Sequence, residues 1–312
     1  MQEYVNADTR RCPVFISIAD LLLVTFVLVD DWYQRKGVYL LGRTVGSKPE
    51  FSDSEMLTLM LAIDFFEFTS ERRYWALVRA NYLDLFPQLI DRSQFNRRAR
   101  SLRYLLNALR QDWAAELGVQ FERHFLLDTT PVIAVGYRRD KNQSGFRGSA
   151  EYGYCSARRL KYFGYKLVML TTLDGTPSSF ELVPANTDER DAADEILDTL
   201  PPDSEVWSDK GFIGEDWQAG WAELDVRVWT AKRENQHDQN PAEFDRLLNS
   251  VRERVEGAFD LLKEGGRSVE HTLAHTVAGI CSRIIAKIAG GTLRLFLRRF
   301  FGTDVLTFTV SA

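Results

Sequence analysis

The 312-residue chain has few cysteines and lacks a long unbroken apolar run. Its three cysteines, Cys12, Cys155 and Cys281, stand far apart without CxxC spacing, which argues against a disulfide framework and a zinc knuckle. The most apolar segment, residues 15–32, is interrupted by Asp20 and is shorter than the roughly 20 apolar residues that a membrane span requires. We therefore interpret it as a buried helix and expect a cytoplasmic protein with no membrane partner.

The chain also lacks an overall positive charge, because its net charge is −5. Taken whole, this balance argues against a nucleic-acid partner. The charge is uneven, however. Residues 187–225 hold 13 acidic and two basic side chains, residues 137–166 hold eight basic and two acidic ones, and residues 92–110 hold six arginines and no acid. The last two segments are therefore candidates for contact with a polyanion.

The first 110 or so residues have helical periodicity. Ser52 and Glu55 stand at the spacing of a capping box, which predicts that a helix begins there. A second helix is expected within residues 69–86, and a third is expected after Ser93. These elements predict an all-α domain over residues 1–112.

The third of these helices has one apolar face, on which Phe95 and Leu102 lie. Arg97, Arg100 and Arg103 point another way and give the helix a cationic outer face. Such a face binds a polyanion or is simply solvated, and composition alone does not decide between the two.

After about Trp113 the pattern changes to short apolar segments that are typical of strands. The expected order is strand, hairpin, helix, strand, helix, strand and long helix, with the hairpin turn at Asp174-Gly175. Five strands are expected in all. Residues 113–312 then form an α/β domain, which ends in amphipathic helices at about residues 268–302.

Two aspartates lie at or near the end of such strands. Asp128 occurs in "LLDTTP" and Asp209 in "SDKGF", and open α/β sheets tend to place their chemistry at the carboxyl ends of strands. Each aspartate could instead be an ordinary turn residue.

A polar line borders the apolar face of the helix expected over residues 247–264. With about 100° per residue, Arg252, Lys263, Glu256 and Asn249 fall roughly 60° to 120° from the centre of that face. Arg252 and Glu256 could be a surface ion pair. Together with two strand-end aspartates, however, Glu256 would complete the oxygen-rich ligand set that Mg²⁺ prefers.

In this order, the motifs resemble those of the DDE transposases of bacterial insertion sequences. "LLDTTP" is similar to the end of the family's first strand, and "SDKGF" to its Asp-Lys-Gly-aromatic motif. Asn249, Arg252, Glu256 and Lys263 follow the spacing of the family's Tyr-x2-Arg-x3-Glu-x6-Lys signature, with Asn249 at the tyrosine position. Residues 146–167 look like the basic, aromatic-rich segment between the family's first two strands.

The resemblance implies a ribonuclease H-like mixed five-stranded sheet flanked by helices. It also implies a mechanism in which Asp128, Asp209 and Glu256 hold two Mg²⁺ ions, for which Mn²⁺ can substitute. Water attacks the phosphodiester at the element's end, and the freed 3′-hydroxyl then attacks target DNA. Such two-ion sites activate the nucleophile and stabilise the leaving oxygen.

The implied partner is double-stranded DNA, both the terminal inverted repeats and the target, bound by a homodimer associated with the nucleoid. The N-terminal helices would recognise the repeats. The basic residues expected to contact DNA are Arg252, Lys263, Lys210, Arg97, Arg100, Arg103, Arg158, Arg159 and Lys161.

Two other functions are considered. A structure-selective nuclease with the same fold would cleave DNA without joining it. A DNA-binding protein derived from a transposase would do neither, but such a protein has no need of three carboxylates in this arrangement. These three readings differ in what they predict for cleavage and strand transfer.

Overall fold

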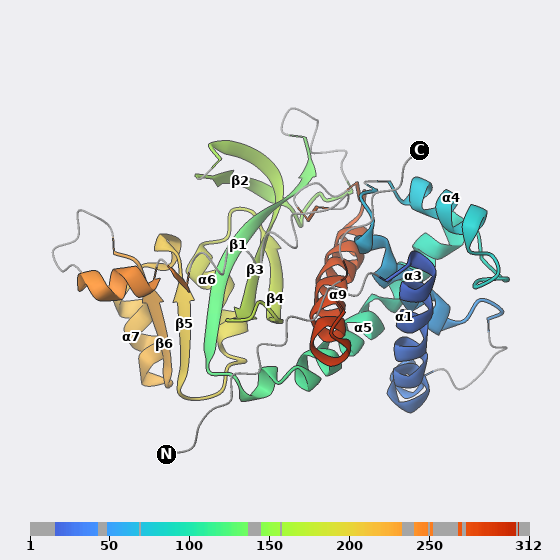
Figure 1. Ribbon diagram of the computed structural model, residues 1–312. Coiled ribbons are helices and arrows are strands. Elements are labelled where there is room, and N and C mark those ends of the chain that lie inside the picture. The colour runs from blue at the N-terminus through green and yellow to red at the C-terminus, as the bar shows by residue number, and fades with distance from the viewer. Residues whose placement is uncertain are drawn as a thin grey trace, which may run out of the picture.

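The computed structural model describes residues 16–42, 49–68, 70–136, 145–156, 158–232, 240–248, 250–251, 268–269, 273–303 and 305. Helices form one part of the molecule and a sheet forms the other, with helix α9 (Val277–Phe301) between them (Figure 1). This arrangement confirms the expected α/β class with a preceding helical region.

The helical part is built from α1 (Ile18–Trp32), the π-helical turn η1 (Tyr33–Gly37), α2 (Val38–Leu40), α3 (Asp53–Ala62), the 3-10 turn η2 (Ile63–Phe65), α4 (Glu71–Asn81) and α5 (Arg92–Glu116). Their apolar faces pack around α3, whose residues are almost all buried. The helix expected over residues 15–32 is only partly buried, because Leu23 and Val27 are about half exposed. It is therefore an amphipathic helix with one face in the core.

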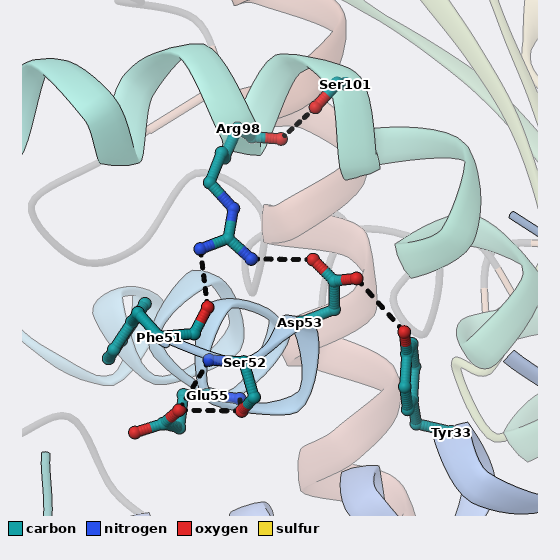
Figure 2. A network of polar contacts seen from close by, with 7 residues as sticks. All are labelled: Tyr33, Phe51, Ser52, Asp53, Glu55, Arg98 and Ser101. Atoms are coloured by element: carbon teal, nitrogen blue, oxygen red, sulfur yellow. Dashed lines mark hydrogen bonds and ion pairs between the residues drawn. The ribbon is translucent and has the colours of Figure 1, made fainter. Parts of the chain in front are cut away.

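The capping box at the start of α3 is present as expected. The Ser52 hydroxyl accepts the Glu55 amide at 3.1 Å, and the Glu55 carboxylate accepts the Ser52 amide at 2.6 Å. Beside it, Asp53 is buried and forms an ion pair with Arg98 at 2.7 Å and a hydrogen bond with the Tyr33 hydroxyl at 3.0 Å (Figure 2). This network joins α3 to α5 and to the turn after α1.

Helix α5 begins at Arg92 rather than after Ser93, because Asp91 caps it in a second capping box with Gln94. At its other end, Arg110 is only 2% exposed and donates to the carbonyl oxygens of Pro177 and Ser178 at 2.8 and 3.2 Å. Burial lowers the pKa of Arg110 to about 10. The guanidinium thus ties the helical part to the sheet.

The sheet contains β1 (His124–Val135), β2 (Glu151–Cys155), β3 (Leu160–Thr172), β4 (Pro177–Pro184), β5 (Ser204–Ser208) and β6 (Val226–Thr230). β1, β5 and β6 run parallel to one another, and β3 is antiparallel to β1. On its far side, β3 pairs with β2 along its first half and with β4 along its second half. The sheet is therefore mixed.

The described residues contain six sheet strands, one more than expected. The additional strand is β2, which lies in the basic, aromatic-rich segment expected between the first two strands. Its exposed tyrosines, Tyr152 and Tyr154, alternate with Gly153. Gly153 is required there because a Cβ atom would lie 2.7 Å from the Ala185 side chain. Because glycine occupies the inward-facing position, the segment lacks the alternation of apolar and polar side chains that identifies a strand in a sequence.

Both faces of the sheet are covered. Helices α6 (Glu189–Leu197) and α7 (Glu215–Glu223) cover one face, where Phe125, Leu127 and Val206 form a core with α6. The other face packs against α9 and against the helical residues 242–248 and 250–251. The catalytic chemistry predicted for this sheet is therefore expected at the carboxyl ends of its strands.

Helix α9 contributes to two cores. Ile280, Ile284 and Ile288 pack on the sheet, whereas Ala289 and Leu293 belong to the core of the helical part. The C-terminal helix was expected to belong to the α/β domain, but only one of its faces packs against the sheet. Within the described residues, no helix is both long enough and apolar enough to cross a membrane.

Candidate active site

Asp128 lies in β1, and Asp209 lies at the matching position directly after the neighbouring parallel strand β5. Leu127 of β1 pairs with Ser208 of β5, so each aspartate directly follows a paired residue. Adjacent strands lie about 4.8 Å apart. The two aspartates, 81 residues apart in the sequence, therefore stand side by side where β5 ends.

Asp128 was expected at or near the end of its strand, but it lies within the strand. It is the fifth residue of β1, which continues to Val135 because its other edge pairs with β3 as far as Val135 and Phe163. β5 ends earlier than β1, so the last part of β1 has no strand partner on the side of β5. We call the place where β5 ends the carboxyl edge of the sheet.

The two aspartates lie on the same face of the sheet. Side chains alternate along a strand, so Asp128 shares the face of Leu126, and Asp209 shares the face of Trp207. Leu126 and Trp207 belong to one buried cluster, together with Leu248 from the helical residues 242–248. The segment that leads toward Glu256 in the sequence therefore packs on the face that carries both aspartates.

Backbone amides orient both carboxylates. Asp128 accepts the amide of Thr129 at 2.7 Å, and Asp209 accepts the amide of Gly211 at 2.8 Å and caps the 3-10 turn η4 (Lys210–Phe212). Both side chains are half-exposed. Half-exposed carboxylates of this kind can serve as oxygen ligands for a hard cation.

Glu256, Arg252, Lys263 and Asn249 lie outside the described residues. Among the residues that the structure does describe, no group of three or more His, Cys, Asp or Glu side chains is arranged to hold a metal ion. The two aspartates are thus the described members of the predicted ligand set.

Basic side chains lie beside this edge. Lys210 directly follows Asp209 and is exposed, and Arg158 and Arg159 are exposed in the turn between β2 and β3. Lys161 and Gly211 both line a hollow of about 540 Å³ that reaches from β2 to η4. Three of the predicted DNA contacts therefore lie on the β2–β3 hairpin, and the hollow connects that hairpin to the edge.

Arg97 and Arg100 line a second hollow, a groove of about 590 Å³ between α4, α5 and the start of α9. Arg103 lies beyond it, where its guanidinium stacks on the Tyr104 ring at 4.0 Å and donates to the carbonyl of Arg100. The walls of this groove come from the helical part and from residues 273–276, and no described strand residue lines it.

Three further arginines line this groove and were not singled out in the sequence: Arg72, Arg92 and Arg283. The acid in the groove, Glu71, is engaged by Arg283 at 3.5 Å and by the Asn96 amide. Among the described residues, Arg72 and Arg92 form no ion pair. The high number of arginines in residues 92–110 was the sequence signal for a cationic surface. It did not distinguish the arginines that line the groove from those with a structural role.

Two of the six arginines in residues 92–110 have structural roles. Arg98 pairs with Asp53, and Arg110 is buried against β4. The cationic face of α5 therefore holds fewer arginines than a count over residues 92–110 indicates, and Arg92, Arg97 and Arg100 are the arginines of α5 that line the groove.

A further acidic residue at the site was not expected. Glu189, the first residue of α6, has one carboxylate oxygen 3.2 Å from the Thr129 hydroxyl. It belongs to the strongly acidic segment 187–225, in which nothing distinguishes it from its neighbours. Burial raises the pKa of Tyr162 nearby to about 12, with smaller contributions from Cys155 and Glu189.

Comparison with known families gives one match. A family model described as a transposase DDE domain matches residues 119–277, about half of the chain. No curated protein and no solved structure matches. The matched segment begins just before β1 and contains Asp128, Asp209 and the predicted Glu256.

Proposed function

This chain belongs to the transposase DDE domain family, and from that premise we propose that it is an active insertion-sequence transposase that cuts the ends of its element and joins them to target DNA. The resemblance to DDE transposases and the ribonuclease H-like fold that it implied are confirmed. The Tyr-Arg-Glu-Lys signature type, in which Asn249 would replace tyrosine, stays a prediction.

The observation that carries the proposal is the pairing of Leu127 with Ser208, which brings Asp128 and Asp209 together on one face of the sheet. Phosphodiester cleavage needs clustered carboxylates at a solvent-accessible position, because a hard cation prefers oxygen ligands. Both aspartates are half-exposed, so a DNA strand can reach them. A transposase with this pair intact is equipped for catalysis, which disfavours a purely DNA-binding protein.

Asp128, Asp209 and Glu256 are the residues that would hold the metal ions, and the two described carboxylates fit that role by their chemistry and their common face. Mg²⁺ held there would lower the pKa of a bound water and stabilise the leaving oxygen. The backbone amides of Thr129 and Gly211 hold the two carboxylates in fixed orientations. Pre-organised ligands of this kind avoid an ordering cost during the reaction.

For DNA binding, we propose that the arginine-lined groove holds the phosphate backbone of the element's end. Arg72, Arg92, Arg97 and Arg100 come from two helices and face one hollow, and phosphate neutralisation by such residues supplies most non-specific affinity. Arg158, Arg159 and Lys161 on the β2–β3 hairpin, and Lys210 next to Asp209, would hold DNA beside the scissile phosphate. Arg252 and Lys263 are proposed for the same role from their spacing to Glu256.

The test is a nicking assay on a DNA fragment that carries the inverted repeat flanking the gene. Asp209→Asn removes the charge with little change in shape, so Mg²⁺-dependent nicking should fall below detection while DNA binding persists. The matched control is Asp203→Asn at the other end of β5, where the aspartate is exposed. Normal nicking by Asp209→Asn would overturn the assignment.

A strand-transfer assay with the same fragment and a target plasmid separates the two enzyme functions. A transposase joins the 3′-ends to the plasmid, whereas a nuclease releases the cut fragment without joining it. Cleavage without joining would therefore replace the proposed function with that of a nuclease.

A further inference from the structure

The carboxylate of Glu189 lies between the two backbone segments that carry the aspartates. One oxygen accepts the hydroxyl of Thr129 at 3.2 Å, and Thr129 directly follows Asp128. The other oxygen lies against Gly211, two residues after Asp209. One side chain from α6 thus touches both β1 and the turn η4.

The contact with Gly211 is close enough that a side chain at that position would have to displace the Glu189 carboxylate. A Cβ atom built on Gly211 would lie 1.9 Å from a Glu189 oxygen and 2.9 Å from the Asp209 Oδ1 atom. Because the Gly211 amide is also the donor to Asp209 at 2.8 Å, a shift of this glycine moves the hydrogen bond that orients Asp209.

Glu189 is itself held from behind. The Lys166 ammonium lies 3.7 Å from its carboxylate and donates to the Thr187 carbonyl at 2.9 Å. Both side chains are largely sheltered, with 15% of Lys166 and 31% of Glu189 exposed. Asp188 caps α6 directly before Glu189. The carboxylate therefore has a fixed place, unlike that of an ordinary surface acid.

Strand alternation places Glu189 behind the aspartates instead of among them. Thr129 lies on the face of Leu127, which packs against α6, whereas Asp128 lies on the opposite face. We infer that Glu189 is a positioning residue, which sets the spacing of Asp128 and Asp209 by contacting Thr129 and Gly211 at once. This inference rests on the proposed function, because it assigns the catalytic role to the two aspartates.

Two variants test it in the full chain. Glu189→Ala removes both contacts and should slow nicking roughly 100-fold at saturating DNA, because small misplacements of reacting groups cost about that much. It should also raise the Mg²⁺ concentration needed for half-maximal nicking. Glu189→Gln keeps the shape and an acceptor for Thr129, so it should retain the rate within about tenfold. Neither variant should change the Kd for end DNA.

The control is Glu195→Ala, since Glu195 is an exposed glutamate on the same helix, and it should behave like the wild type. Hydrogen exchange gives a readout that does not depend on activity. In Glu189→Ala, the amides of residues 209–212 should exchange faster while those of β1 residues 125–127 do not change. Exchange that rises throughout α6 and β5 would instead mean a loss of fold, and Glu189→Gln would then carry the test.

Gly211→Ala supplies a second, independent measurement. Its Cβ would displace the Glu189 carboxylate, 1.9 Å away, and crowd the Asp209 Oδ1 atom, 2.9 Å away, so the single variant should lose at least as much activity as Glu189→Ala. In the double variant with Glu189→Ala the clash with Glu189 is gone, and the two losses should not multiply.

Wild-type nicking and Mg²⁺ dependence in Glu189→Ala, beside an inactive Asp209→Asn, would overturn this inference and leave the proposed function standing. If Asp209→Asn also nicks normally, the proposed function fails as well. Losses that multiply in the double variant would show that Glu189 and Gly211 act separately.

Discussion

Two aspartates of this protein, Asp53 in the helical part and Asp209 at the sheet edge, have opposite environments. Asp53 is buried, and Arg98 and Tyr33 bind its two oxygens (Figure 2). Asp209 is half-exposed and accepts a backbone amide two residues away. The first carboxylate joins three distant segments, whereas the second presents charge to solvent at a fixed orientation.

The difference shows that the charge of a side chain does not by itself reveal whether the residue is structural or part of a functional site. A buried carboxylate that a guanidinium and a hydroxyl bind contributes to stability, and its loss leaves the partner charge uncompensated. A half-exposed carboxylate held by an amide remains available to a ligand. Variants of the two sites should therefore separate activity from stability, and the following predictions run from the largest effect to the smallest.

Asp128→Asn should lower the rate of Mg²⁺-dependent nicking by at least roughly 10³-fold, equivalent to about 4 kcal/mol of activation free energy. Its melting temperature should stay within a few degrees of the wild-type value, because asparagine has the same shape as aspartate and its amide oxygen can still accept the Thr129 amide. Single-turnover kinetics and thermal denaturation measure the two effects. A large fall in melting temperature would mean that the sheet edge is structural like the Asp53 network.

Asp53→Ala should have the converse effect and lower the free energy of unfolding by about 3 kcal/mol, because it leaves Arg98 without its partner in a sheltered site. Below the melting temperature, nicking should proceed at nearly the wild-type rate. Urea denaturation measures the stability, and Glu50→Ala, which changes an exposed acid three residues before Asp53, is the control. An unchanged unfolding midpoint would contradict the structural role.

Arg110→Ala should destabilise the protein by about 2 kcal/mol, since the carbonyls of Pro177 and Ser178 lose a buried donor. The effect should appear as a loss of cohesion between α5 and β4. Limited proteolysis, with cleavage mapped by mass spectrometry, should detect new sites near residues 173–178. Proteolysis like that of the wild type would show that this contact does not join the two parts.

Arg97→Ala and Arg100→Ala should each weaken binding of end DNA by about 1 kcal/mol and reduce the slope of log Kd against log salt by roughly 1. Folding should not change, because neither side chain forms an ion pair in the described part of the chain. Fluorescence anisotropy at several salt concentrations measures both quantities. Arg298→Ala, at the far end of α9, is the control. Equal affinity and slope in the groove variants would remove the groove from the DNA interface.

Local features of the fold were predictable from the sequence. The capping box of Ser52 and Glu55 and the turn at Asp174-Gly175 depend on contacts within four residues, and both are present. The strand β2 was missed because its inward position is Gly153, and Asp128 was placed at or near a strand end although β1 continues beyond it by pairing with β3. Both errors concern contacts between segments that are distant in the sequence.

In the candidate site, too, features that depend on near neighbours were predictable and those that depend on distant segments were not. Short motifs predicted Asp128 and Asp209 as site residues, whereas the register of Leu127 with Ser208, which sets them side by side, is a property of the folded sheet. Glu189 was not chosen, because its importance depends on a glycine 22 residues away and a threonine 60 residues away. The predictions for Glu256, Arg252 and Lys263 still rest on helical spacing.

By itself, the sequence determined the order of the elements apart from β2, the cap of α3 and the choice of the two aspartates as candidates, because these depend on periodicity and on motifs of near neighbours. Only the tertiary structure decided which arginines are structural, such as Arg98, and which line a groove, such as Arg97. It also decided that Asp128 and Asp209 share one face and that Glu189 lies behind them. Those properties depend on strand register and on packing between distant segments, which no local pattern encodes.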